Sequence, residues 1–189
     1  MPILGIMASQ ISGHLWAPEG AYDSLATVTL SANTTSITFA GIPAGYKHLQ
    51  IRGLSRATRA NSNNNYYISF NGDTNTSNYN AHWLVGDGSS ASASQLSGVS
   101  GMGSIFSINV AATSTANVFS GINIDILDYA ATTKNKTVRT LSGYDANGSG
   151  NVGLFSGLWL NTSAITSITL QTFFDQYAAN STFALYGIK

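Results

Sequence analysis

Histidines and carboxylates are the side chains in this sequence that could catalyse a reaction. His48 and His82 lie near predicted strands, and His14 lies near the N-terminus. A Ser-His-Asp triad needs three groups in contact, but the chain has 25 serines, so a serine lies near any histidine by chance. No Gly-x-Ser-x-Gly turn is present. We therefore expect no catalytic histidine.

Paired carboxylates could hydrolyse a glycoside if they lay roughly 5–9 Å apart. The closest pair in the sequence is Asp125 and Asp128. Their odd spacing places them on opposite faces of a continuing strand. The sequence thus predicts that the protein is not an enzyme, with a polysaccharide hydrolase kept as a third alternative.

One string resembles part of a calcium loop. Asp145, Asn147 and Ser149 copy the first half of an EF-hand, but Ser156 stands where the bidentate glutamate is needed. A glycine-rich turn explains the same string, so the three residues form only a weak calcium candidate. The chain has no cysteine, which excludes disulfides and thiolate metal sites. We expect no cofactor.

Aromatic side chains lie among asparagines and serines in the middle of the chain. Tyr66, Tyr67, Tyr79 and Trp83 could stack on a sugar while amides and hydroxyls bind its oxygens. The same residues could instead fill a core or an interface. They are therefore candidates for glycan binding, with burial as the more common alternative.

Charge is scarce in this sequence. Only 8% of the residues are charged, against roughly 25% in an ordinary domain, and Ser, Thr and Asn together supply 61 of the 189 residues. A neutral surface gives little repulsion between copies, which favours association. Eight basic residues balanced by eight acidic ones do not supply a nucleic-acid surface.

Residues 1–22 differ from the rest and form a predicted N-terminal arm. We expect the arm either to cross its own sheet or, as we favour, to bind a partner. Its apolar run lacks a preceding Lys or Arg and is too short for a signal peptide, and no stretch reaches the ~18 apolar residues of a membrane span. These features predict synthesis in a cytoplasm and no membrane partner. The apolar residues of the arm are Ile3, Leu4, Ile6, Met7, Ile11, Leu15 and Trp16.

Residues 23–189 alternate between apolar and polar side chains, as strands do. In 121–127, for example, three isoleucines face one way and Asn123 and Asp125 face the other. About ten or eleven such strands with turns between them predict an all-β, antiparallel β-sandwich, for which we favour a jelly roll. Residues 86–103 read as a loop. The scarcity of Lys and Pro leaves the sheet edges poorly guarded, so we expect a homo-oligomer. The predicted strands are 25–30, 36–39, 47–54, 66–70, 81–85, 105–110, 121–127, 136–141, 152–160, 165–170 and 182–188.

Five strings across the chain resemble small virion structural proteins of tailed bacteriophages, often marine ones. The resemblance implies a component of the particle: a capsid decoration (cement) protein, a head fibre or a tail fibre. It implies no catalytic residues. The strings are residues 3–9 (ILGIMAS), 42–52 (IPAGYKHLQIR), 70–73 (FNGD), 124–129 (IDILDY) and 183–189 (FALYGIK).

These observations lead to one functional expectation and one alternative. We expect a virion protein that decorates and stabilises the phage head, assembles as a homo-oligomer such as a trimer, and binds other virion proteins through its arm. Its partners would be the major capsid protein or tail proteins. The alternative is a tail or head fibre, a receptor-binding module that recognises host surface glycans. The sequence does not distinguish head from tail.

Overall fold

The structure is a computed structural model that describes residues 20–97 and 104–189. The first strand begins at Tyr22, at the end of the predicted arm. His14 and all seven apolar residues named for that arm, from Ile3 to Trp16, lie outside the described residues. Within the part that is described, no helix has the length and apolar character needed to cross a bilayer.

The described chain forms twelve β-strands and one short 3-10 helix, η1 (Thr76–Asn78). Every strand pair is antiparallel, which confirms the predicted fold class. In chain order the strands are β1 (Tyr22–Thr29), β2 (Ser36–Ala40), β3 (His48–Ser55), β4 (Asn63–Phe70), β5 (Tyr79–Gly86), β6 (Ala91–Ser97), β7 (Ser104–Val110), β8 (Ser120–Leu127), β9 (Lys136–Asp145), β10 (Gly150–Trp159), β11 (Ser167–Thr172) and β12 (Thr182–Ile188).

The strands form two sheets with the topology of a jelly roll. One sheet has the order β1-β12-β3-β8-β9-β10-β5-β6, and the other has the order β2-β11-β4-β7. Without the hairpins β5–β6 and β9–β10, the remaining eight strands pair first with last, second with seventh, third with sixth and fourth with fifth. That nested pairing is a rolled-up antiparallel ribbon, the two-sheet jelly roll. The sequence predicted this topology, although it did not give the strand order.

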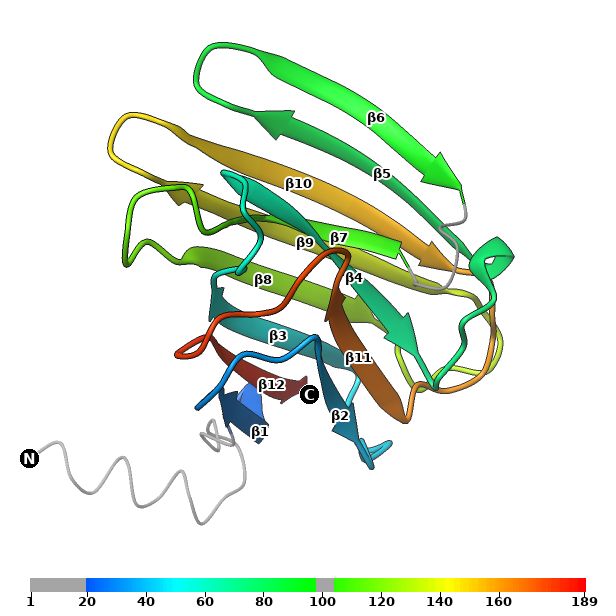
Figure 1. Ribbon diagram of the computed structural model, residues 1–189. Helices are drawn as coiled ribbons and strands as arrows, with labels where there is room; N and C mark the ends of the chain where they lie inside the picture. Colours follow the sequence, from blue (N-terminus) through cyan, green and yellow to red (C-terminus); the bar gives the residue numbers. More distant parts are fainter. Residues whose placement is uncertain (1–19, 98–103) are drawn as a thin grey trace, which may run out of the picture.

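The two extra hairpins lengthen one sheet beyond the other. β9, β10, β5 and β6 continue the larger sheet past β8, and Figure 1 shows β10, β5 and β6 extending past the smaller sheet. Strand β6 corrects the prediction of a loop over 86–103. Its sequence, ASASQLS, lacks the alternating large side chains that signal a strand, and all but Leu96 are exposed. It forms because its backbone pairs with β5.

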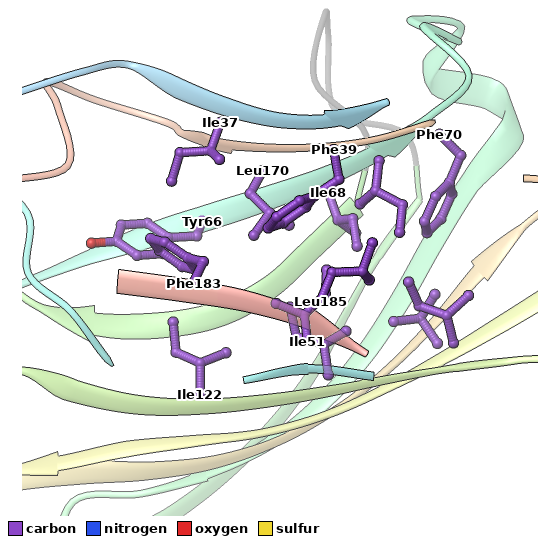
Figure 2. Packing of buried hydrophobic residues seen from close by; sticks show 14 of the residues in the cluster. Ile37, Phe39, Ile51, Tyr66, Ile68, Phe70, Ile122, Leu170, Phe183 and Leu185 are labelled. Atoms are coloured by element: carbon purple, nitrogen blue, oxygen red, sulfur yellow. The ribbon is translucent and has the colours of Figure 1, made fainter. Parts of the chain in front are cut away.

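The main core lies between the jelly-roll sheets. Alternate residues of each strand face inward, as the three isoleucines of β8 do, and Figure 2 shows side chains from β2, β4 and β11 pointing toward those of β3, β8 and β12. A second, smaller cluster lies under the extension, where β7 packs against β9 and β10. It consists of Tyr67, Val85 and Phe155, with Trp83, Leu96, Ile108 and Phe173 packed around it.

A buried lysine ties together two loops at one end of the sandwich. Lys136 opens β9 and its side chain is fully buried. Its Nζ donates hydrogen bonds to the carbonyl oxygens of Ala131 at 2.6 Å, Lys134 at 3.0 Å and Thr162 at 3.0 Å. Burial lowers the pKa of Lys136. The ammonium group thus links the β8–β9 loop to the β10–β11 loop.

Candidate functional site

The outer face of the eight-stranded sheet breaks the usual alternation. An antiparallel sheet with one solvated face normally turns polar residues outward. Here five outward positions carry aliphatic side chains that are half exposed or more, and we call them the outer apolar patch. They are Leu54 (58% exposed), Leu84 (50%), Leu141 (50%), Val152 (57%) and Leu154 (55%).

Three of these residues form a continuous ridge. Leu154 on β10 lies directly opposite Leu141 on β9 and, on its other side, opposite Leu84 on β5. Cross-strand neighbours lie about 4.5–5.5 Å apart, so the three side chains are adjacent. We call Leu84, Leu141 and Leu154 the leucine ridge.

A trough runs beside the ridge, one outward row further along the strands. Its register joins Leu54, Gly121, Gly143 and Val152 on β3, β8, β9 and β10. Two glycines therefore form the floor, and nothing lies within 4 Å of a Cβ placed on Gly121. The walls are the aliphatic side chains of Leu54 and Val152. This glycine trough is a groove of about 670 Å³.

A second groove, of about 680 Å³, lies on the other side of the ridge and shares Asn123 and Leu141 with the trough. Its polar wall is one cross-strand row: Asp125, Arg139, Ser156 and His82. Three strand spacings, about 14 Å, separate Asp125 from His82. That distance rules out contact between an orienting acid and a base, so this row is not a Ser-His-Asp triad.

Arg52 and Tyr186 line one end of the trough, and Tyr22 lies beside them. The Arg52 guanidinium lies 5.3 Å from the Tyr22 ring centre and 5.7 Å from that of Tyr186. Its Nε donates to Gln50 Oε1 at 2.7 Å, and Gln50 Nε2 donates to Asp125 Oδ1 at 2.7 Å. These contacts hold the polar margin in place and give it both signs of charge.

The sheet edges carry almost no charge. β1 and β6 border the larger sheet, and β2 and β7 border the smaller one. Their sequences contain a single charged residue, Asp23, and neither Lys nor Pro. Charges and prolines are the usual guards against pairing with another chain. The described edge strands therefore lack the usual guards against strand addition.

The predicted glycan cluster does not form a surface site, which corrects that prediction. Tyr66, Tyr67 and Tyr79 are buried in the core, and burial raises the pKa of Tyr67 and of Tyr79 to about 12. Trp83 is on the inner face of β5, with its ring centre 6.4 Å from that of Phe155. These aromatic side chains pack in the two hydrophobic clusters, which is the burial alternative that the sequence left open.

The candidate calcium string is a β-hairpin turn. Asn147 and Gly148 both have positive φ, at 64° and 95°, as a two-residue type I′ turn requires. Asp145 Oδ1 accepts hydrogen bonds from the backbone N–H of Asn147 at 2.7 Å and of Gly148 at 3.2 Å. The carboxylate therefore stabilises the turn, as the glycine-rich alternative expected. Across 20–97 and 104–189, no three His, Asp or Glu side chains converge as metal ligands.

Two remaining catalytic candidates, Asp128 and His48, make hydrogen bonds that fix the start of the β8–β9 loop. Asp128 follows β8 and accepts from Lys134 Nζ, and its own N–H donates to His48 Nδ1 at 2.9 Å. The Lys134 hydrogen bond, which is the largest lowering influence, holds the pKa of Asp128 below its usual range despite an opposing effect of desolvation. Asp125 lies on the outer face of β8, separated from this group in the strand register.

Sequence reasoning missed the outer apolar patch. The signal was present: Leu141, Leu154 and Leu84 occupy the outward parity of strands whose inward positions are also filled. Recognising the patch required the cross-strand register, which places these three leucines side by side. The chain matches no protein-family model and no curated protein.

Proposed function

We propose that this chain is a structural protein of a bacteriophage particle and that it decorates and stabilises the capsid head. The observation that carries the proposal is the outer apolar patch, an aliphatic surface that residues 20–97 and 104–189 leave exposed, on a sandwich whose described edges lack guards. Exposed apolar surface of this kind marks an interaction site. Jelly rolls occur in viral capsid and lectin domains, which agrees with the virion strings, although a fold alone does not fix a function.

The work of such a protein is cohesion. Decoration would bury the patch between neighbouring copies of this chain on the shell, so opening the shell would expose it again. The expected partners are the major capsid protein and further copies of this chain, and the place of action is the virion after synthesis in the host cytoplasm. The arm, residues 1–22, would supply a second apolar contact.

Binding to particles tests this proposal. Purified protein is added to heads that lack it, and bound protein and the temperature of shell opening are measured. Leu154→Asp should abolish both binding and stabilisation, whereas Thr133→Asp, at an exposed position in the β8–β9 loop, should leave both intact. Failure of the unchanged protein to bind heads or tails would refute a virion role.

The arm and the location need separate measurements. Ile6→Asp and Trp16→Asp in the full chain should weaken particle binding if the arm is an anchor, and unchanged binding would remove that idea. Antibody labelling of particles in the electron microscope separates the readings: label over the shell supports decoration, and label confined to the tail supports a fibre that recognises host glycans.

A further inference from the structure

We infer that the outer apolar patch is a two-fold interface between two copies of this chain. The inference rests on the proposed function, because it identifies the surface through which the assembling protein joins itself. It names face-to-face packing of two eight-stranded sheets, which normally lie about 10 Å apart.

The shape of the face is self-complementary. The leucine ridge stands beside the glycine trough, in neighbouring outward rows of the same strands. A two-fold axis in the plane of the interface, passing between ridge and trough, brings the ridge of each copy over the trough of the other. This is an isologous contact, in which every pairing occurs twice. Each strand then lies over its own copy, so Leu141 of one molecule meets Gly143 of the other, and Leu84 meets Gly86.

The size of the face suits a stable dimer. Residues lining the two grooves come from seven neighbouring strands, β12 to β6, so the face is ~34 Å wide when each strand covers about 4.8 Å. Three outward rows cover about 20 Å along the strands. The resulting area of roughly 700 Å² per copy approaches the ~800 Å² per partner of standard interfaces.

The charges of the face suit a second copy better than a charged partner. The five patch residues are uncharged, and the margin carries Arg52 and Arg139 against Asp125. Two copies therefore meet without strong repulsion. A ring trimer would need two different surfaces, so this face produces a dimer and a trimer would have to use other surfaces, such as the sheet edges.

Sedimentation velocity of the full chain over a wide concentration range tests the interface. We expect a dimer, with Leu154→Asp and Leu141→Asp each weakening dimerisation at least ~100-fold and Thr133→Asp leaving it unchanged. Circular dichroism checks that every variant is folded. A monomeric parent chain overturns the inference, and so does a dimer that both leucine variants retain.

Cysteine cross-linking provides a readout independent of destabilised variants, because the chain has no cysteine of its own. Leu141 lies next to the inferred axis, but sheets about 10 Å apart leave the two copies about 12 Å from Cα to Cα, beyond a direct disulfide. A short bis-maleimide should therefore join Leu141→Cys into a covalent dimer and should not join Thr133→Cys, in the exposed β8–β9 loop. Equal cross-linking of both overturns the inference. A monomer that still binds phage heads through the patch would refute only this inference, whereas a patch-dependent dimer that binds no particle would refute only the proposed function.

Discussion

Replacing Lys136 with methionine tests whether one buried ammonium group holds two loops together. Its three hydrogen bonds reach carbonyl oxygens on either side of one end of the sandwich. Hydrogen bonds to charged groups contribute about 1.5–3 kcal/mol each, or roughly 5–9 kcal/mol for the three. Removing the ammonium from water offsets several kcal/mol of this. Methionine fills similar space without either effect.

We therefore expect Lys136→Met to lower the free energy of unfolding by about 2–4 kcal/mol. For a chain of this size that corresponds to a Tm lower by roughly 5–15 °C. Urea denaturation, followed by tryptophan fluorescence, should show a lower midpoint with an unchanged slope.

Lys134 provides a matched control in the same loop. Its side chain is 58% exposed and pairs with Asp128, so Lys134→Met should change stability by less than about 1 kcal/mol. If Lys136→Met is as stable as the parent, the ammonium costs as much to bury as its bonds return, and the reasoning is refuted.

Two further predictions concern other fixed contacts. Burial alone would raise the pKa of Asp73, but hydrogen bonds from Trp159 Nε1 and from the loop hold that pKa below its usual value. The ionised carboxylate therefore stabilises the fold fully above about pH 4, and this stabilisation is lost as the pH falls through the lowered pKa. Asp73→Asn should remove that acid dependence in denaturation curves from pH 2 to 5. Gly187→Ala should destabilise by about 1–3 kcal/mol, because the added methyl group would overlap the Tyr46 ring; a Tm equal to that of the parent would contradict this.

The fold was predictable where alternation was clean. Ile122, Ile124 and Ile126 fixed both the strand and its buried face, since period-two hydrophobicity has one physical solution in a half-buried sheet. β6 was not predicted because its small residues show no alternating hydrophobicity, and its backbone is held as a strand by pairing with β5. The nested strand order escaped for a related reason: pairing between distant strands leaves no local mark in the sequence.

The predicted glycan site was wrong because it was inferred from the residue types around the aromatic side chains and not from their positions in the fold. Tyr79 sits among polar residues in the sequence, yet its ring is buried, and its hydroxyl accepts from the Phe70 N–H at 3.1 Å and donates to the Asp73 carbonyl at 3.0 Å. A tyrosine with both bonds made in the core has no need of a surface. The outer apolar patch was missed for the opposite reason. Its leucines are single residues in separate strands, and only the pairing register brings them together into one surface.

Several of the few charged side chains hydrogen-bond to backbone groups of loops. The Arg56 guanidinium donates to the carbonyls of residues 112, 114, 115 and 118, and Lys136 fastens two further loops. Asp87 and Asp145 accept backbone N–H groups in their own turns. Several of the few charged groups are thus engaged within the chain, where they replace the water that loop backbones would otherwise need. The outer apolar patch itself carries no charge and is bordered by Arg52, Arg139 and Asp125. Such a surface gives little electrostatic repulsion to a second copy or to a shell. The few charged side chains thus mainly stabilise loops within the chain, and the five aliphatic positions of the patch leave the centre of the inferred interface uncharged.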